Sequence, residues 1–243
     1  MPETGRSKDG ARVIVAVAQR PGSEPPCADG VDVQRRGDRV SAVVVDGAGH
    51  DQDVVRYAAV VPPVITHTGI ALGGLAGLMA AGQMAYAYGT PPHASAVYAS
   101  AEPGWPTSVH WIGDCRAYGW HEGQLTLWST DMTMGQWLRR NGGVPVKIAE
   151  AHDNWARLGL AQSAPSTCRQ VEIPEETALV LLVSDGISDQ VSAAVIRELC
   201  RIHGADPQAL ADALVAAVQP DADGYRDDAS VVVLLRPAGQ RRR

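Results

Sequence analysis

Four aspartates stand where apolar, strand-like segments end or begin. Asp46, Asp114 and Asp185 each follow an apolar run, and Asp227 comes shortly before another. A single Asp-Gly pair is ordinary turn chemistry, and that explanation stays open for any one of them. If the four strand ends meet at one edge of the sheets, however, the crowded carboxylates raise one another's pKa. A hard cation such as Mg²⁺ or Mn²⁺ relieves that repulsion and binds carboxylate, carbonyl and water oxygens.

Such a site predicts hydrolysis of a phosphate ester. Two ions about 3.5–4 Å apart hold a hydroxide for in-line attack on phosphorus. Zinc is less suited, because no cluster of His and Cys with ligand spacing accompanies the acids. The four cysteines, Cys27, Cys115, Cys168 and Cys200, form no CxxC pair and are expected to be reduced residues of the core.

Short apolar segments predict the elements that position these acids. Several of them are rich in Val, Ile and Leu, and most are bounded by Gly, Asp or Pro, as strands are. Strands come in runs with helices between the runs, which indicates an α+β fold with largely antiparallel sheets. Residues 121–123 are expected to turn one strand into the next as a hairpin. The predicted strands are 12–18, 39–45, 95–99, 107–113, 116–120, 124–128, 179–183 and 230–235; the predicted helices are 51–61, 69–85, 133–141, 190–203 and 211–218.

Length and charge narrow the class of protein. The chain has 243 residues and a formal net charge of −6, which argues against a dedicated nucleic-acid binder. We expect one domain over 11–236, between a disordered N-terminus at 1–10 and a frayed Arg-rich tail at 237–243. Residues 1–10 lack the apolar core of a secretory signal, and the apolar stretch 69–85 is too short to span a bilayer. A cytoplasmic protein that binds no membrane is therefore expected.

Four motifs in order carry a family resemblance. They are VDGAGH at 45–50, IGDCRAY at 112–118, LVSDGISD at 182–189 and DDASVVV at 227–233. Weaker matches are TDMT at 130–133 and HDNWARLG at 152–159. The chain resembles the PP2C family of metal-dependent protein Ser/Thr phosphatases, in its compact bacterial form, over almost all of 12–235.

The resemblance implies a four-layer α-β-β-α sandwich, in which two antiparallel sheets are flanked by helices. It also implies two Mn²⁺ or Mg²⁺ ions and a third, weaker one. Asp46 would bridge two ions, the Gly47 carbonyl would bind the second, and Asp185 and Asp227 would hold the first. Asp29 would act mainly through bound waters, and Asp114 would join Asp185 at the third ion. The bridging hydroxide would attack phosphorus directly, so Asp46, Asp185 and Asp227 are the residues expected to carry catalysis.

Four positions depart from the family pattern. Glu24 stands where the family often has an arginine that binds phosphate, although a shifted loop could present Arg20 instead. His50 replaces a glycine and is either a solvated residue or a general acid. Met132 replaces the histidine of the weaker motif. Asp228 replaces an asparagine, so either Asp227 or Asp228 could be the ligand.

The resemblance therefore predicts an enzyme that removes phosphate from phosphoserine and phosphothreonine in signalling proteins. Its partners would be the phosphorylated targets of a Ser/Thr kinase. The alternative, motivated by Glu24 and Met132, is a pseudophosphatase that keeps the fold and binds phosphoproteins or a kinase without efficient turnover. The chain leaves the oligomeric state open.

Overall fold

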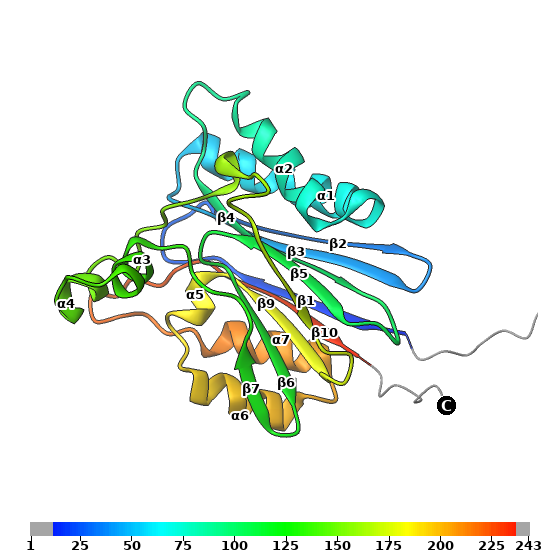
Figure 1. Ribbon diagram of the computed structural model, residues 1–243. Helices are drawn as coiled ribbons and strands as arrows, with labels where there is room; N and C mark the ends of the chain where they lie inside the picture. The colour runs from blue at the N-terminus through cyan, green and yellow to red at the C-terminus, as the bar shows by residue number, and fades with distance from the viewer. Residues whose placement is uncertain (1–11, 237–243) are drawn as a thin grey trace, which may run out of the picture.

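Two five-stranded antiparallel sheets pack face to face in the computed structural model, which describes residues 12–236 (Figure 1). The first sheet has the order β1-β10-β9-β6-β7, and the second has the order β2-β3-β4-β5-β8. The strands of the first sheet are β1 Ile14–Arg20, β6 Arg116–His121, β7 Gln124–Leu127, β9 Leu179–Val183 and β10 Ala229–Leu235. Those of the second are β2 Asp29–Arg36, β3 Arg39–Gly47, β4 Ala94–Ala101, β5 Thr107–Ile112 and β8 Arg169–Ile173.

Helices cover the outer face of each sheet, which confirms the predicted four-layer α-β-β-α sandwich (Figure 1). Helices α1 and α2 pack on the second sheet, and α6 and α7 pack on the first. The short helices α3, α4 and α5 lie together at one end of the sandwich (Figure 1). The bounds are α1 Gln52–Leu72, α2 Gly74–Ala85, α3 Met134–Asn141, α4 Val146–Glu150, α5 Asp185–Ser188, α6 Ala193–His203 and α7 Pro207–Ala217, with a 3₁₀ turn at Leu160–Gln162.

Strand β3 shows why the central strands are almost continuously apolar. Its Val44 packs between the two sheets, whereas Val43 and Val45 pack against the helical layer, and all three are fully buried. A strand covered on both faces needs apolar residues at successive positions rather than at alternate ones. The same holds for β9, whose Leu181 and Leu182 lie on opposite faces of the first sheet.

Most predicted elements are present with small shifts at their ends. The helix predicted over 51–61 was ended too early, because α1 continues through Pro62 and Pro63 to Leu72. The hairpin at 121–123 is confirmed, with Glu122 and Gly123 at positive φ between β6 and β7, as a tight two-residue turn requires. The single helix predicted over 69–85 is wrong, because Gly73 has φ 99° and ψ 154° and separates α1 from α2. Strands β2 and β8 were not predicted. Both are edge strands with polar, half-covered side chains, so neither carries a clear apolar pattern.

The expectations for the two chain ends, at 1–10 and 237–243, lie outside the described residues. Among residues 12–236, no helix combines the length and the apolar character needed to cross a membrane.

Candidate metal centre

Asp29 and Asp46 face each other across the β2–β3 pair. Asp29 is the first residue of β2, and the antiparallel register places it opposite Asp46, near the end of β3. Directly opposed residues of such a pair have Cα atoms about 4.5–5.5 Å apart. Gly47 follows Asp46, and its N–H donates to the Ala28 carbonyl at 3.0 Å, which holds the segment before β2 against the end of β3. The hairpin thus brings together two predicted site residues that are 17 positions apart in the sequence.

Asp114 joins this row through Ser95. On its other side, Asp46 pairs with Ser95 of β4, and the Ser95 hydroxyl donates to Asp114 Oδ1 at 2.6 Å. The backbone N–H of Asp114 donates back to the same hydroxyl at 3.3 Å. Asp114 lies in the turn between β5 and β6 and is 8% exposed. The serine therefore holds the Asp114 carboxylate at the strand position next to Asp46, a role that the sequence analysis did not assign.

The first sheet contributes Asp185 and Asp227. Asp185 is the first residue of α5, directly beyond β9, and Asp227 lies just before β10, the neighbouring strand. Gly186 allows the two segments to touch, because a Cβ atom there would lie 2.0 Å from the Asp228 carbonyl and 3.2 Å from the Asp227 Cβ. The glycine of this motif is thus needed for close approach of the backbone.

Asp228 has a structural role. Its Oδ1 accepts from the Gly22 N–H at 2.5 Å, and its Oδ2 accepts from the Ala28 N–H at 2.7 Å. The side chain is 3% exposed and fixes both ends of the segment that joins β1 to β2. Asp227 is less committed, since its Oδ1 accepts from the Tyr225 hydroxyl at 3.1 Å and from the Asp228 N–H at 2.9 Å. Of the two neighbouring acids, Asp227 is the one available to an ion.

The five candidate acids share one electrostatic environment. Burial, followed by the charges of Asp185, Asp29 and other acids, holds the pKa of Asp46 well above its usual range. Burial and neighbouring carboxylates likewise keep the pKa of Asp185 well above its usual range. For Asp29, burial is the main cause, and Asp228 and Asp227 add to it, raising the pKa to about 7. Asp114 is shifted upward mainly by burial, against the hydrogen bond from Ser95 that lowers its pKa.

These residues fit a divalent ion in chemistry but do not form a closed cage. All the candidate side chains are carboxylates, the donors that Mg²⁺ and Mn²⁺ prefer. Asp29 Oδ2 is buried without a hydrogen-bond partner, which marks an acceptor left for a cation. Within residues 12–236, however, no three His, Cys, Asp or Glu side chains converge closely enough to hold an ion by themselves. The acids are nevertheless near enough for their charges to raise one another's pKa values.

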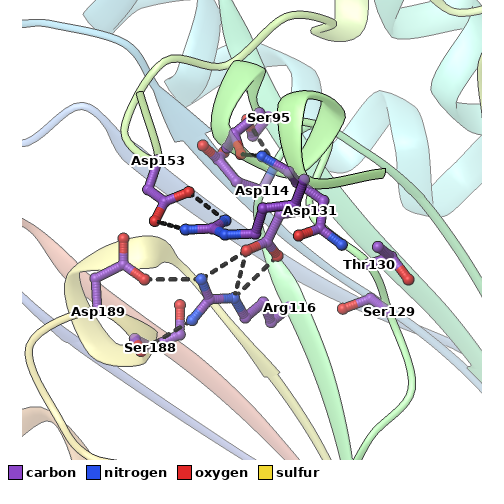
Figure 2. Close-up of polar contacts among 12 residues, drawn as sticks. Ser95, Asp114, Arg116, Ser129, Thr130, Asp131, Asp153, Ser188 and Asp189 are labelled. Atoms are coloured by element: carbon purple, nitrogen blue, oxygen red, sulfur yellow. Dashed lines mark hydrogen bonds and ion pairs between the residues drawn. The ribbon is translucent and has the colours of Figure 1, made fainter. Parts of the chain in front are cut away.

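An ion-pair network beside these acids was not predicted (Figure 2). Arg116 binds Asp131 through Nε, at 2.9 Å from Oδ1, and through Nη2, at 2.7 Å from Oδ2. The same Nη2 lies 2.8 Å from Asp189 Oδ1, and Nη1 donates to the Ser188 carbonyl at 2.9 Å. Figure 2 shows Arg116 between these two acids, with Asp114 and Ser95 next to Asp131. The network ties α5 to the segment that leads into α3. Each member lies in a quoted motif, but only the fold shows that they meet.

The position where the family often has a phosphate-binding arginine is occupied by Glu24. Glu24 Oε2 lies 4.0 Å from His50 Nε2, and His50 Nδ1 lies 3.1 Å from the Pro26 carbonyl. Arg20 is not presented there, because its Nη1 donates to the carbonyls of Val215 and Val218 at the end of α7. The alternative that a shifted loop presents Arg20 is therefore wrong. His50 instead pairs with the loop that carries Glu24.

Comparison with known proteins identifies the family of the chain. A family model described as Stage II sporulation protein E (SpoIIE) matches residues 108–237, more than half of the chain. The chain belongs to the SpoIIE family, a family of PP2C-type phosphatases. The matched part contains three of the four quoted motifs, with Asp114, Asp185 and Asp227. No curated protein is significantly similar to the chain in sequence.

Solved structures show that this SpoIIE-family chain has the fold of bacterial Ser/Thr phosphatases. The Ser/Thr phosphatase of S. agalactiae is 14% identical, with a TM-score of 0.78 over 93% of this chain and 100% of that chain. The PPM phosphatase MsPP of Mycobacterium smegmatis is 20% identical, with a TM-score of 0.74 over 93% and 100%. The catalytic domain of PstP, solved with two manganese ions, is 22% identical, with a TM-score of 0.68 over 92% and 97%. At these identities, the likeness concerns the fold.

Proposed function

We propose that this SpoIIE-family protein is a Mn²⁺- or Mg²⁺-dependent phosphatase that acts on phosphoserine and phosphothreonine in proteins. The observation that carries the proposal is that five acids, Asp29, Asp46, Asp114, Asp185 and Asp227, lie at neighbouring strand ends, where burial and nearby carboxylates raise the pKa of the first four. Divalent ions bound there would lower the pKa of a water molecule and neutralise charge on the phosphoryl oxygens. The manganese ions of the PstP domain support the same assignment by likeness of fold.

We assign different roles in ion binding to the candidate acids. Asp46 lies between Asp29 and the Ser95–Asp114 pair, which suits it to contact two ions, with the Gly47 carbonyl beside it. Asp185 and Asp227 approach from the first sheet and would hold one of these ions. Asp29 would act through water, and Asp114 with Asp185 would hold a third, weaker ion. Arg116 positions α5, and with it Asp185, by its bonds to Asp189 and the Ser188 carbonyl.

The second candidate is a pseudophosphatase that binds phosphoproteins without efficient turnover. It is favoured by Glu24, an acid at the position where the family often binds phosphate, and by Arg20, whose Nη1 is bound to carbonyls at the end of α7. The complete set of candidate acids favours the enzyme.

Hydrolysis of p-nitrophenyl phosphate by the purified protein separates the two candidates. We expect turnover with Mn²⁺ that disappears with EDTA and returns when Mn²⁺ is restored. A folded protein without turnover in Mn²⁺ or Mg²⁺ would contradict the enzyme and favour the binding module. Release of phosphate from phosphothreonine peptides would then establish the substrate class.

Metal binding should stabilise the protein more at alkaline than at acidic pH. The pKa of Asp29 is about 7 in the folded chain, above its value of about 4 in the unfolded chain, so folding favours the protonated acid. Without metal, stability from this group is therefore present below pH 4 and is lost as the pH rises from about 4 to 7. An ion must compete with the proton across the same range. We expect the Mn²⁺-induced rise in Tm over EDTA to be larger at pH 8 than at pH 5.5, by differential scanning fluorimetry. An equal Mn²⁺-induced rise in Tm at both pH values would contradict the competition between metal and proton.

A further inference from the structure

A pocket of about 300 Å³ lies beside the candidate metal centre, between α3, the segment before β8 and strand β5. Three arginines line it and come from three different segments: Arg140 from the end of α3, Arg157 from the loop after α4 and Arg169 from the start of β8. The pocket is thus assembled by the fold from segments that are distant in the sequence.

The three arginines are not neutralised by the protein. Within residues 12–236, none of them makes an ion pair or a side-chain hydrogen bond. Asp131 is the only acid that lines the pocket among the described residues, and it is already paired with Arg116. The pocket therefore carries positive charge on a chain whose net charge is −6.

Two tryptophans give the pocket firm walls. The Trp111 indole N–H donates to the Thr130 carbonyl at 2.9 Å, which fixes the ring, and the side chain is only 5% exposed. The guanidinium of Arg157 lies 5.2 Å from the centroid of the Trp137 ring, which also lines the pocket. A cation–π contact of this kind holds an arginine in place without using its hydrogen-bond donors. Arg157 thus keeps its donors free for an oxyanion.

The pocket adjoins the candidate metal centre through Asp131. That residue lines the pocket and also binds Arg116, which contacts Asp189 beyond α5 (Figure 2). The Met132 N–H donates to the Gly113 carbonyl at 3.0 Å, which places this wall of the pocket next to Asp114. An extended peptide with its phosphate at the metal centre would carry neighbouring side chains past the pocket.

We propose that this arginine pocket binds an anionic side chain near the phosphorylated residue, so that the enzyme selects acidic substrates. The inference rests on the proposed phosphatase function, whose substrate class it narrows. Guanidinium groups match the geometry of carboxylate and phosphate oxygens, and paired charges form the stronger hydrogen bonds. An aspartate or glutamate and a second phosphoryl group share this chemistry, and the test distinguishes them.

The test compares phosphothreonine peptides that differ only in the flanking residues. One peptide carries glutamates on both sides of the phosphothreonine, one carries glutamines, and one carries a second phosphothreonine. The measured quantity is kcat/KM for phosphate release with Mn²⁺. We expect the wild-type protein to prefer the glutamate or the doubly phosphorylated peptide over the glutamine peptide by about 10-fold or more. The larger of the two preferences identifies the source of the anion.

Substitution of the arginines should lower the preference for acidic peptides, and not only the overall rate of hydrolysis. We expect Arg140→Gln, Arg157→Gln and Arg169→Gln each to lower the ratio of acidic to neutral kcat/KM by about 3-fold, and the triple variant to bring it near one. Arg197→Gln is the matched control, because Arg197 is an exposed arginine on α6 without an ion pair and its loss changes the net charge equally. It should leave the ratio unchanged. The proposal would be contradicted if the wild-type protein hydrolysed the acidic and neutral peptides with similar kcat/KM. It would also be contradicted if Arg197→Gln lowered this ratio as much as the pocket variants do.

Binding without turnover keeps this test independent of the proposed function. An unphosphorylated, fluorescently labelled glutamate peptide is titrated with protein in EDTA, and anisotropy is measured. We expect about 10-fold weaker binding by the triple arginine variant than by Arg197→Gln. If no peptide is hydrolysed but the triple variant binds the glutamate peptide more weakly, the anion-binding role of the pocket is supported and the phosphatase function is contradicted. If peptides are hydrolysed but wild-type and triple variant bind alike, the pocket fails and the function stands.

Discussion

Asp46→Asn should abolish metal-dependent turnover and, at the same time, stabilise the metal-free protein. Burial and the charges of Asp185, Asp29 and Asp114 penalise the Asp46 carboxylate, and asparagine removes the charge while keeping the shape. We expect a gain of about 1 kcal/mol at pH 7.5, within the usual range for a single substitution. In a chain of this size that raises Tm by about 2–4 °C in EDTA. Turnover of p-nitrophenyl phosphate with Mn²⁺ should fall by at least about 100-fold, because Asp46 is the acid proposed to contact both ions.

The pH dependence identifies the cause of this stabilisation. The folded pKa of Asp46 is raised, so the penalty is absent below the unfolded pKa of about 4 and grows as the pH rises above it. The difference in Tm between Asp46→Asn and wild type should therefore vanish near pH 4. Asp38→Asn is the control, since Asp38 is an exposed acid in the turn at the other end of the β2–β3 hairpin. It should change neither turnover nor the EDTA stability appreciably. If Asp46→Asn has a lower Tm than wild type in EDTA, the Asp46 carboxylate is not destabilised by burial and neighbouring acids.

Asp228→Ala should lower the stability of the protein, whereas Asp227→Ala should abolish its turnover. The Asp228 carboxylate accepts from two backbone N–H groups at 2.5 and 2.7 Å and is nearly inaccessible. Its removal leaves these donors without acceptors, at about 1–3 kcal/mol each, so we expect a loss of about 3–5 kcal/mol. That corresponds to a fall in Tm of about 6–20 °C in thermal melts. Asp227→Ala removes a partly exposed side chain, and we expect a smaller fall together with loss of Mn²⁺-dependent turnover.

Asp206, which caps a helix, is a control for the stability loss expected in Asp228→Ala. Asp206 also accepts from two backbone N–H groups, those of Gln208 and Ala209, but it caps α7 in an exposed position. Asp206→Ala should cost about 1 kcal/mol, the usual value for an N-cap. If Asp228→Ala costs no more than Asp206→Ala, the two acids play similar roles and the assignment of Asp228 as a buried structural residue is wrong. If Asp227→Ala retains full turnover, Asp227 is not a ligand.

The sequence by itself determined the fold class and the identity of the candidate acids. Central strands such as β3 and β9 are buried on both faces, so their apolar runs are long enough to recognise. The acids stand at the ends of these runs, and that position already indicated their convergence. The edge strands β2 and β8 escaped prediction, because a half-covered strand needs few apolar residues.

Tertiary structure alone decided which side chains are free to act. Asp227 and Asp228 are adjacent in the sequence, but only the fold shows that the Gly22 and Ala28 backbone occupies one of them. Arg20 is near Glu24 in the chain, yet it binds carbonyls of α7, nearly 200 residues away. The arginine pocket likewise joins three segments separated by helices and loops. Hydrogen bonds and charges act between neighbours in space, and sequence spacing does not encode those neighbours.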